Sequence, residues 1–129
     1  MAIFEKKFGG HIYVQLFKDK IVARLIETGE TNKYLVENSF HHPRMLVGDF
    51  QVAESELTKA VSPLFGKGFI KRTPIFIMHQ REMLDGGLTK IEIKVLKELG
   101  LGAKAREAHI WQSHELSDQE ILNGIYKNC

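Results

Sequence analysis

A short apolar run, Pro74–Met78 (PIFIM), restricts the fold of this chain more than any other segment of the sequence. Turn signals and polar residues bound the run, and no polar side chain interrupts it. A strand with this pattern is buried on both faces, as in a parallel sheet that is covered by helices. We therefore expect an α/β fold with this strand at the centre of the sheet.

The first third of the chain has the period-two pattern of strands. Apolar residues alternate over His11–Phe17, the pattern resumes over Ile21–Thr28, and a third strand is expected over Tyr34–Phe40. The cluster Thr28–Asn32 is typical of turns that join antiparallel strands. This part of the sequence predicts an antiparallel meander.

The rest of the chain alternates between helical and strand patterns. In chain order we expect a helix from Val52 that closes at Ser62-Pro63, the buried strand, a helix from Thr89 that ends at Gly100 and Gly102 with a left-handed cap, a strand at Ala108–Trp111, and a helix opened by the capping box Ser117–Glu120. The expected order is β-β-β-α-β-α-β-α. It describes a mixed sheet in which parallel β-α-β units follow the meander and helices pack on the faces.

Length and composition indicate one folded domain without an obvious charged partner. The 129 residues are 43% hydrophobic and 26% charged, which is ordinary globular composition. We expect a flexible segment at residues 1–10 and one domain at residues 11–129. The formal charge of +2 does not favour a nucleic-acid or anionic-membrane surface. No apolar run is long enough for a signal peptide or a membrane span, so we expect a cytoplasmic protein.

The segment from Ile91 to Trp111, IEIKVLKELGLGAKAREAHIW, resembles the bacterial actin homologue MreB. In that family a helix of this pattern runs into a Gly-Ala-x-Ala-Arg-Glu stretch before a strand, and Gly102–Glu107 (GAKARE) matches it. The looser match runs from Ile12 to Gly124. The resemblance implies the ribonuclease-H-like fold that actins, sugar kinases and Hsp70 chaperones share. Only the first subdomain, which carries the first phosphate loop, would be present.

The phosphate loop of the MreB family is degenerate in this chain. The resemblance places an Asp-x-Gly-Thr motif in the first hairpin, where the acid works with Mg²⁺ and the glycine admits a phosphate close to the backbone. Gln15 replaces the acid, Phe17 the glycine and Lys18 the hydroxyl residue. We therefore expect no nucleotide cofactor, and these positions are the trace of a lost site.

Other catalytic arrangements are also missing from the sequence. A ribonuclease-H nuclease needs an acid within the first strand, but Asp19 falls in the turn, and Glu27 and Glu37 read as hairpin charges. Ser113-His114 are neighbours, and adjacency alone does not make a nucleophile and base pair. Cys129 is the single cysteine, which excludes an intramolecular disulfide and a cysteine-based zinc cluster. We expect no catalytic residue.

The histidines are the basis of the main alternative function, a ligand or metal site. His41 and His42 are adjacent, so on a strand they would point to opposite faces. His79, His109 and His114 follow or lie within the later strands, near the sheet edge where α/β folds hold ligands. Their spacing matches no metal-ligand pattern, so we expect no metal site.

Two glycine-containing segments have competing interpretations. Gly86-Gly87 precedes a helix and reads as a turn more readily than as an anion-binding nest, because the other residues of a P-loop are absent. The basic segment Lys67–Arg72 is expected to be a solvated loop, with a weak nucleic-acid contact as the alternative reading.

The functional prediction follows from these absences. We expect a non-catalytic, MreB-like interaction module that works with a protein partner or as a homodimer, in cell-shape, division or envelope machinery, without nucleic acid. Half of a two-lobed ATPase leaves a face that another chain can cover. The alternative is a small ligand-binding or metal-binding protein, or an enzyme, that uses the histidine-bearing sheet edge.

Overall fold

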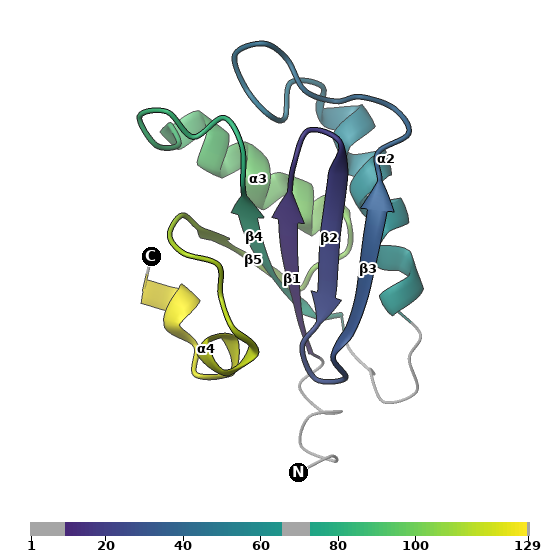
Figure 1. The fold of residues 1–129 in the computed structure, drawn as a ribbon, viewed down its shortest axis with the longest axis vertical. Coiled ribbons are helices and arrows are strands. Elements are labelled where there is room, and N and C mark those ends of the chain that lie inside the picture. The colour runs from purple at the N-terminus through teal and green to yellow at the C-terminus, as the bar shows by residue number, and fades with distance from the viewer. Residues whose placement is uncertain (1–9, 66–72, 129) are drawn as a thin grey trace.

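One five-stranded mixed sheet organises the protein (Figure 1). This computed structural model describes residues 10–65 and 73–128. The strands are β1 (His11–Leu16), β2 (Lys20–Leu25), β3 (Glu30–Leu35), β4 (Ile75–Gln80) and β5 (Glu107–Trp111), in the sheet order β3-β2-β1-β4-β5. The first three strands pair antiparallel, β4 is parallel to β1, and β5 is parallel to β4. The expected mixed sheet with helices is therefore confirmed.

The helices cover the two faces of the sheet unequally. They are α2 (Phe50–Val61), α3 (Lys90–Gly102) and α4 (Asp118–Leu122), with short 3₁₀ turns η1 (Ser62–Leu64) and η2 (Ile125–Asn128). Figure 1 shows α2 and α3 together behind the strands, where they share the main apolar core with β1, β2 and β4. On the other face α4 and η2 cover β1, β4 and β5 through a smaller cluster around Tyr13, Ile77 and Trp111.

The buried strand lies next to the sheet centre. All six residues of β4 are buried, as the apolar run predicted. The central position belongs to β1, however, because the antiparallel strands add on one side of it and the parallel strands on the other. The placement of Pro74–Met78 at the centre was therefore wrong. β4 is buried because β1 and β5 flank it and helices cover both of its faces.

The third strand begins earlier than the sequence predicted. The turn closes at Gly29, whose φ of 80° suits glycine and whose N–H donates to Leu25 O at 2.8 Å. Glu30 then pairs directly with Leu25, so the segment read as a turn at Thr28–Asn32 is partly strand. Phe40, expected at the end of this strand, is buried in a loop and accepts hydrogen bonds from Gly48 and Asp49.

Neither glycine of α3 forms its cap, and Gly100 serves packing. Gly100 and Gly102 lie within the helix, and the left-handed residue that follows is Lys104, with φ of 82°. A Cβ on Gly100 would stand 3.0 Å from Ala108 Cβ and 3.3 Å from Met78 Sδ. The expected glycine cap is therefore wrong, and Gly100 instead lets α3 approach β4 and β5.

The expected end of α2 and the expected capping box are confirmed. α2 ends at Val61, directly before Ser62-Pro63. The Ser117–Glu120 capping box is formed, but α4 stops at Leu122 because Gly124, with φ of 76°, breaks the chain direction before η2. Gly86 and Gly87 form the expected turn, with φ of 78° and 77°.

Several expectations fall on residues that the structure does not describe. The flexible segment at residues 1–10 is described only at Gly10, and the basic segment Lys67–Arg72 and Cys129 lie outside the described residues. No helix within the described residues is both long and apolar enough to cross a membrane.

Candidate functional site

The carboxyl ends of β1 and β4 meet at one edge of the sheet, and this edge holds Gln15, Phe17 and Lys18, which the sequence comparison predicted to match a phosphate loop. β1 leads into the hairpin at residues 17–19, and β4 leads into the loop that starts at Arg81. Arg81 N–H donates to Leu16 O at 2.9 Å, which continues the parallel ladder past both strands. The two loops therefore lie side by side, as open parallel sheets require of a ligand site.

Phe17 is held at this edge by two cations. Lys20 Nζ lies 4.7 Å from the centroid of the Phe17 ring, and Arg81 Cζ lies 5.8 Å from it. The Arg81 guanidinium also donates to Gln15 Oε1 and lies 3.5 Å from Glu115 Oε1. The predicted positions Gln15 and Phe17 are thus tied together through Arg81.

Lys18 presents its backbone N–H to a carboxylate of the protein. The N–H donates to Glu82 Oε2 at 2.7 Å. In a phosphate-binding hairpin such a backbone donor faces the anion. Here the Glu82 carboxylate takes that place, and its charge opposes a phosphate approaching the same donor.

The loop after β4 positions the Glu82 side chain beside the hairpin. Gln80 is 3% exposed, and its Nε2 donates to Glu82 O at 2.9 Å and to Met83 O at 3.3 Å. Met83 adopts a left-handed backbone, with φ of 60°. Sequence reasoning did not single out Arg81, Glu82 or Gln80. The available signal was a polar Gln-Arg-Glu stretch at the end of a buried strand.

A shallow depression of about 440 Å³ lies beside this edge. Its lining combines the cations Lys18 and Arg44 with Asp85 and the apolar residues Pro43, Met83 and Leu84. The depression is open to solvent and has both signs of charge. It does not define one ligand class.

His79 is buried beneath the edge and paired with Tyr13. The Tyr13 hydroxyl accepts from Leu116 N–H at 3.1 Å and lies 2.6 Å from His79 Nδ1. His79 also bonds the Ser113 backbone, so its Nε2 carries the hydrogen and Nδ1 accepts from Tyr13. Burial, followed by the charge of Arg81, lowers the pKa of His79 to about 4, and burial raises the pKa of Tyr13. The pair fixes residues 113–116 against the sheet.

The other edge histidines are engaged separately. His109 Nε2 lies 2.9 Å from Glu107 Oε1, and His114 Nε2 lies 2.8 Å from Glu120 Oε2. Within the described part of the chain, no group of three His, Cys, Asp or Glu residues is close enough to hold a metal ion. The structure therefore does not bring His79, His109 and His114 to one centre.

The side chains of Ser113 and His114 contact each other, which adjacency in the sequence does not by itself require. Ser113 Oγ lies 3.4 Å from His114 Nδ1, and the other ring nitrogen of His114 bonds Glu120. Both Ser113 and His114 are exposed, and neither lines any of the three depressions described in this section. A nucleophile, base and orienting acid need a substrate cavity and an oxyanion site, which this contact alone does not supply.

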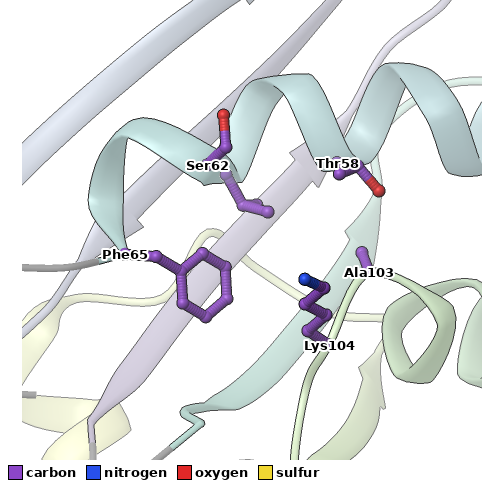
Figure 2. Close-up of a pocket in the computed structure, with 6 residues that line it drawn as sticks. Thr58, Ser62, Phe65, Ala103 and Lys104 are labelled. Atoms are coloured by element: carbon purple, nitrogen blue, oxygen red, sulfur yellow. The ribbon is translucent and has the colours of Figure 1, made fainter. Parts of the chain in front are cut away.

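A mainly apolar pocket of about 230 Å³ lies on the helical side, away from the hairpin edge (Figure 2). It is formed by the end of α2 and the residues that follow α3, and it is lined by Thr58, Val61, Ser62, Phe65, Ala103 and Lys104. No sequence pattern predicted it. A second groove of about 220 Å³ lies between α3 and β5 and is lined by Ile93, Lys97, Ala108, His109, Ile110 and Gln112.

Fold and site together define a small α+β protein with a mixed sheet. At its hairpin edge the Glu82 carboxylate accepts the hydrogen bond of the Lys18 backbone N–H. No protein-family model matches the chain. The chain is 31% identical over 121 residues to the uncharacterized protein YjaA of Escherichia coli (strain K12), and the match covers 86% of this chain and 93% of that protein. The chain belongs to the YjaA family.

Proposed function

We propose that this protein is a non-catalytic interaction module on an MreB-like, ribonuclease-H-like scaffold, acting in cell-shape, division or envelope machinery. The antiparallel meander continued by parallel strands supports the scaffold. The position of the GAKARE stretch supports it too, because α3 ends at Gly102 and β5 begins at Glu107. Its partner is another protein or a second copy of the chain.

The hydrogen bond from Lys18 N–H to Glu82 is the observation that carries the non-catalytic proposal. A nucleotide at this edge would need that donor, space at Phe17 and a cation held by an acid at position 15. The donor is occupied, the space holds a ring between two cations, and Gln15 bears no charge. What remains of such a scaffold is its surface, which can bind protein.

The alternative of a ligand-binding or metal-binding histidine edge has less support. His79 is 2% exposed and has both ring nitrogens bonded. His109 and His114 each bond a different carboxylate. A ligand would have to break these contacts before it could recruit the rings.

Three measurements test the proposal together, two on the purified protein and one in the native host. Light scattering after size exclusion reads its mass at several concentrations, and chemical crosslinking in the native host followed by mass spectrometry reads its neighbours. We expect either a mass that rises with concentration or a reproducible crosslinked protein, and a melting temperature that Mg-ATP leaves unchanged. A constant monomer with no crosslinked neighbour, or a melting temperature raised several degrees by Mg-ATP, would contradict it.

A further inference from the structure

β5 is an edge strand with free backbone groups. In the parallel ladder Glu107, His109 and Trp111 pair with Ile75, Ile77 and His79, whose own backbone groups face β1, so the backbone groups of Glu107, His109 and Trp111 bond β4. The backbone groups of Ala108 and Ile110 therefore point outward. No residue within 10–65 or 73–128 bonds these outward groups. Such an edge is a template for one more strand.

The groove beside this edge has an apolar floor. Ala108 and Ile110 of β5 and Ile93 of α3 line the 220 Å³ groove, with Lys97 on its wall. Ile110 and Ile93 are only partly buried. A strand added to β5 would place alternate side chains into this groove, because side chains of a strand alternate between faces.

The wall of the groove is positively charged. Lys90 precedes Lys97 by two helical turns, so both lie on the same side of α3. Neither lysine forms an ion pair with any residue that the structure describes. The nearest acid of β5, Glu107, is already bonded by His109 at 2.9 Å and lies 3.6 Å from Arg106. The groove therefore lacks a matching negative charge.

The opposite edge is less suited to the same role. β3 also ends the sheet, but Lys33 stands exposed in its middle, as in edges that discourage pairing. Its side chains Asn32 and Tyr34 are already bonded to α2, at Ala60 O and Glu56 Oε1. None of the three depressions that we describe runs along β3.

We propose that the groove between β5 and α3 binds an extended segment of a partner protein, which adds to β5 as a sixth strand. Its α3-facing side chains alternate an aliphatic residue, seated on Ile93 and Ile110, with an acidic residue that pairs with Lys97. This inference rests on the proposed interaction function and names its surface and the chemistry of its partner.

The probe is a phage-displayed library of random heptapeptides, selected on the purified wild-type protein. We expect the enriched peptides to carry Asp or Glu two residues from Val, Ile or Leu. A synthetic copy of the most enriched peptide is then measured by fluorescence anisotropy. Lys97→Glu should weaken its binding by about tenfold or more, because the acid then meets a like charge. Lys33→Glu makes the same charge change on β3 and should leave binding unaltered.

A second variant tests the strand pairing itself. Ile110→Ala controls for the loss of the Ile110 side chain from the groove. Ile110→Pro removes an outward N–H that does not bond β4, so the ladder to β4 keeps its hydrogen bonds. It should abolish peptide binding while circular dichroism and the melting temperature show a folded protein. If this variant fails to fold, amide NMR of the wild type replaces it, and peptide should shift the Ala108 and Ile110 amides.

The outcomes separate this site from the general function. Enriched peptides without acids, equal binding to wild type and Lys97→Glu, or amide shifts confined to β3 would overturn the β5 site. If the crosslinked neighbours of the host then persist in Lys97→Glu, the interaction function stands and only this surface is wrong. If no peptide is enriched and no neighbour is crosslinked, both proposals fail.

Discussion

Lys18 and Glu82 are 64 residues apart in the chain, and the backbone N–H of Lys18 donates to the Glu82 carboxylate at 2.7 Å. The bond joins the first hairpin to the loop after β4. It closes the sheet edge at which the MreB resemblance places a phosphate. The bond therefore has two separable consequences, one for stability and one for ligand binding.

Removing the Glu82 carboxylate should weaken the joint between the two loops. Glu82→Ala leaves Lys18 N–H to water, so we expect a loss of about 1 kcal/mol in the free energy of unfolding, measured with urea. Glu82→Gln keeps an acceptor and should lose less. An unfolding midpoint for Glu82→Ala equal to that of wild type would show that the bond does not hold the loops together.

Glu56 is a buried carboxylate that anchors the segment after β3. It is fully buried and accepts hydrogen bonds from Glu37 N–H at 2.7 Å and the Tyr34 hydroxyl at 3.1 Å. Burial alone would raise the pKa of Glu56, but hydrogen bonds from the backbone of Glu37 and Asn38 outweigh it and hold the pKa below its ordinary value. We expect Glu56→Gln to lose about 2 kcal/mol of stability at pH 7.

The pH dependence of this loss has a definite sign. Because the pKa of Glu56 is lower in the folded protein than in the unfolded chain, its contribution is complete above the ordinary carboxyl pKa. It disappears as the pH falls through the folded pKa. Urea unfolding from pH 7 to about pH 3 should show wild type and Glu56→Gln converging. Glu98→Gln, on the exposed face of α3, is the control. A difference that stays constant with pH would refute the role.

Tyr13 and His79 pin residues 113–116 to the sheet. Tyr13→Phe removes the acceptor of Leu116 N–H and the donor to His79 Nδ1, both buried. We expect a loss of about 2 kcal/mol, because two buried polar groups become unsatisfied. Tyr126→Phe is the comparison, because no hydrogen bond of the Tyr126 hydroxyl is found within the described residues. An effect at Tyr13 no larger than at Tyr126 would contradict this role of Tyr13.

His79 should also titrate abnormally. Burial lowers its pKa to about 4, so NMR of the ring carbons should show a neutral Nε2–H tautomer down to about that pH. The unfolded chain protonates His79 near its ordinary value, so stability is complete above about pH 6.5 and falls as the pH drops toward 4. A ring that titrates near 6.5 would show that His79 is not enclosed.

The two glycines of α3 should respond differently to substitution by alanine. At Gly102 a Cβ would meet the terminal carboxylate of Glu54, which can rotate away, so Gly102→Ala should stabilise the helix by up to about 1 kcal/mol. At Gly100 it would press on Ala108 Cβ at 3.0 Å and Met78 Sδ at 3.3 Å, inside the core, so Gly100→Ala should bring no such gain. Equal melting temperatures for the two variants would contradict the packing role of Gly100.

Local patterns predicted the elements of the fold well. The apolar run became the fully buried β4, and the Ser117–Glu120 capping box formed as expected. Errors arose where one residue decided the backbone. Gly29 moved the start of β3, and Lys104 took the left-handed position expected of glycine. The centre of the sheet depends on which strands pair, and hydrophobicity alone does not encode that pairing.

The site was only partly predictable for a related reason. The hairpin positions Gln15, Phe17 and Lys18 could be compared with a known motif. Glu82 could not, because its contact depends on Gln80 and on the left-handed Met83, which turn the distant loop toward the hairpin. Sequence spacing does not reveal a contact of this range.

The most direct test of the proposal that this edge does not bind a nucleotide is an amide NMR titration of the protein with Mg-ATP. We expect the amides of Phe17, Lys18 and Glu82 to stay in place up to millimolar nucleotide, because the Lys18 donor is bonded within the protein. A saturable shift centred on the Lys18 amide would show that the protein binds a nucleotide at this edge and would contradict the non-catalytic proposal.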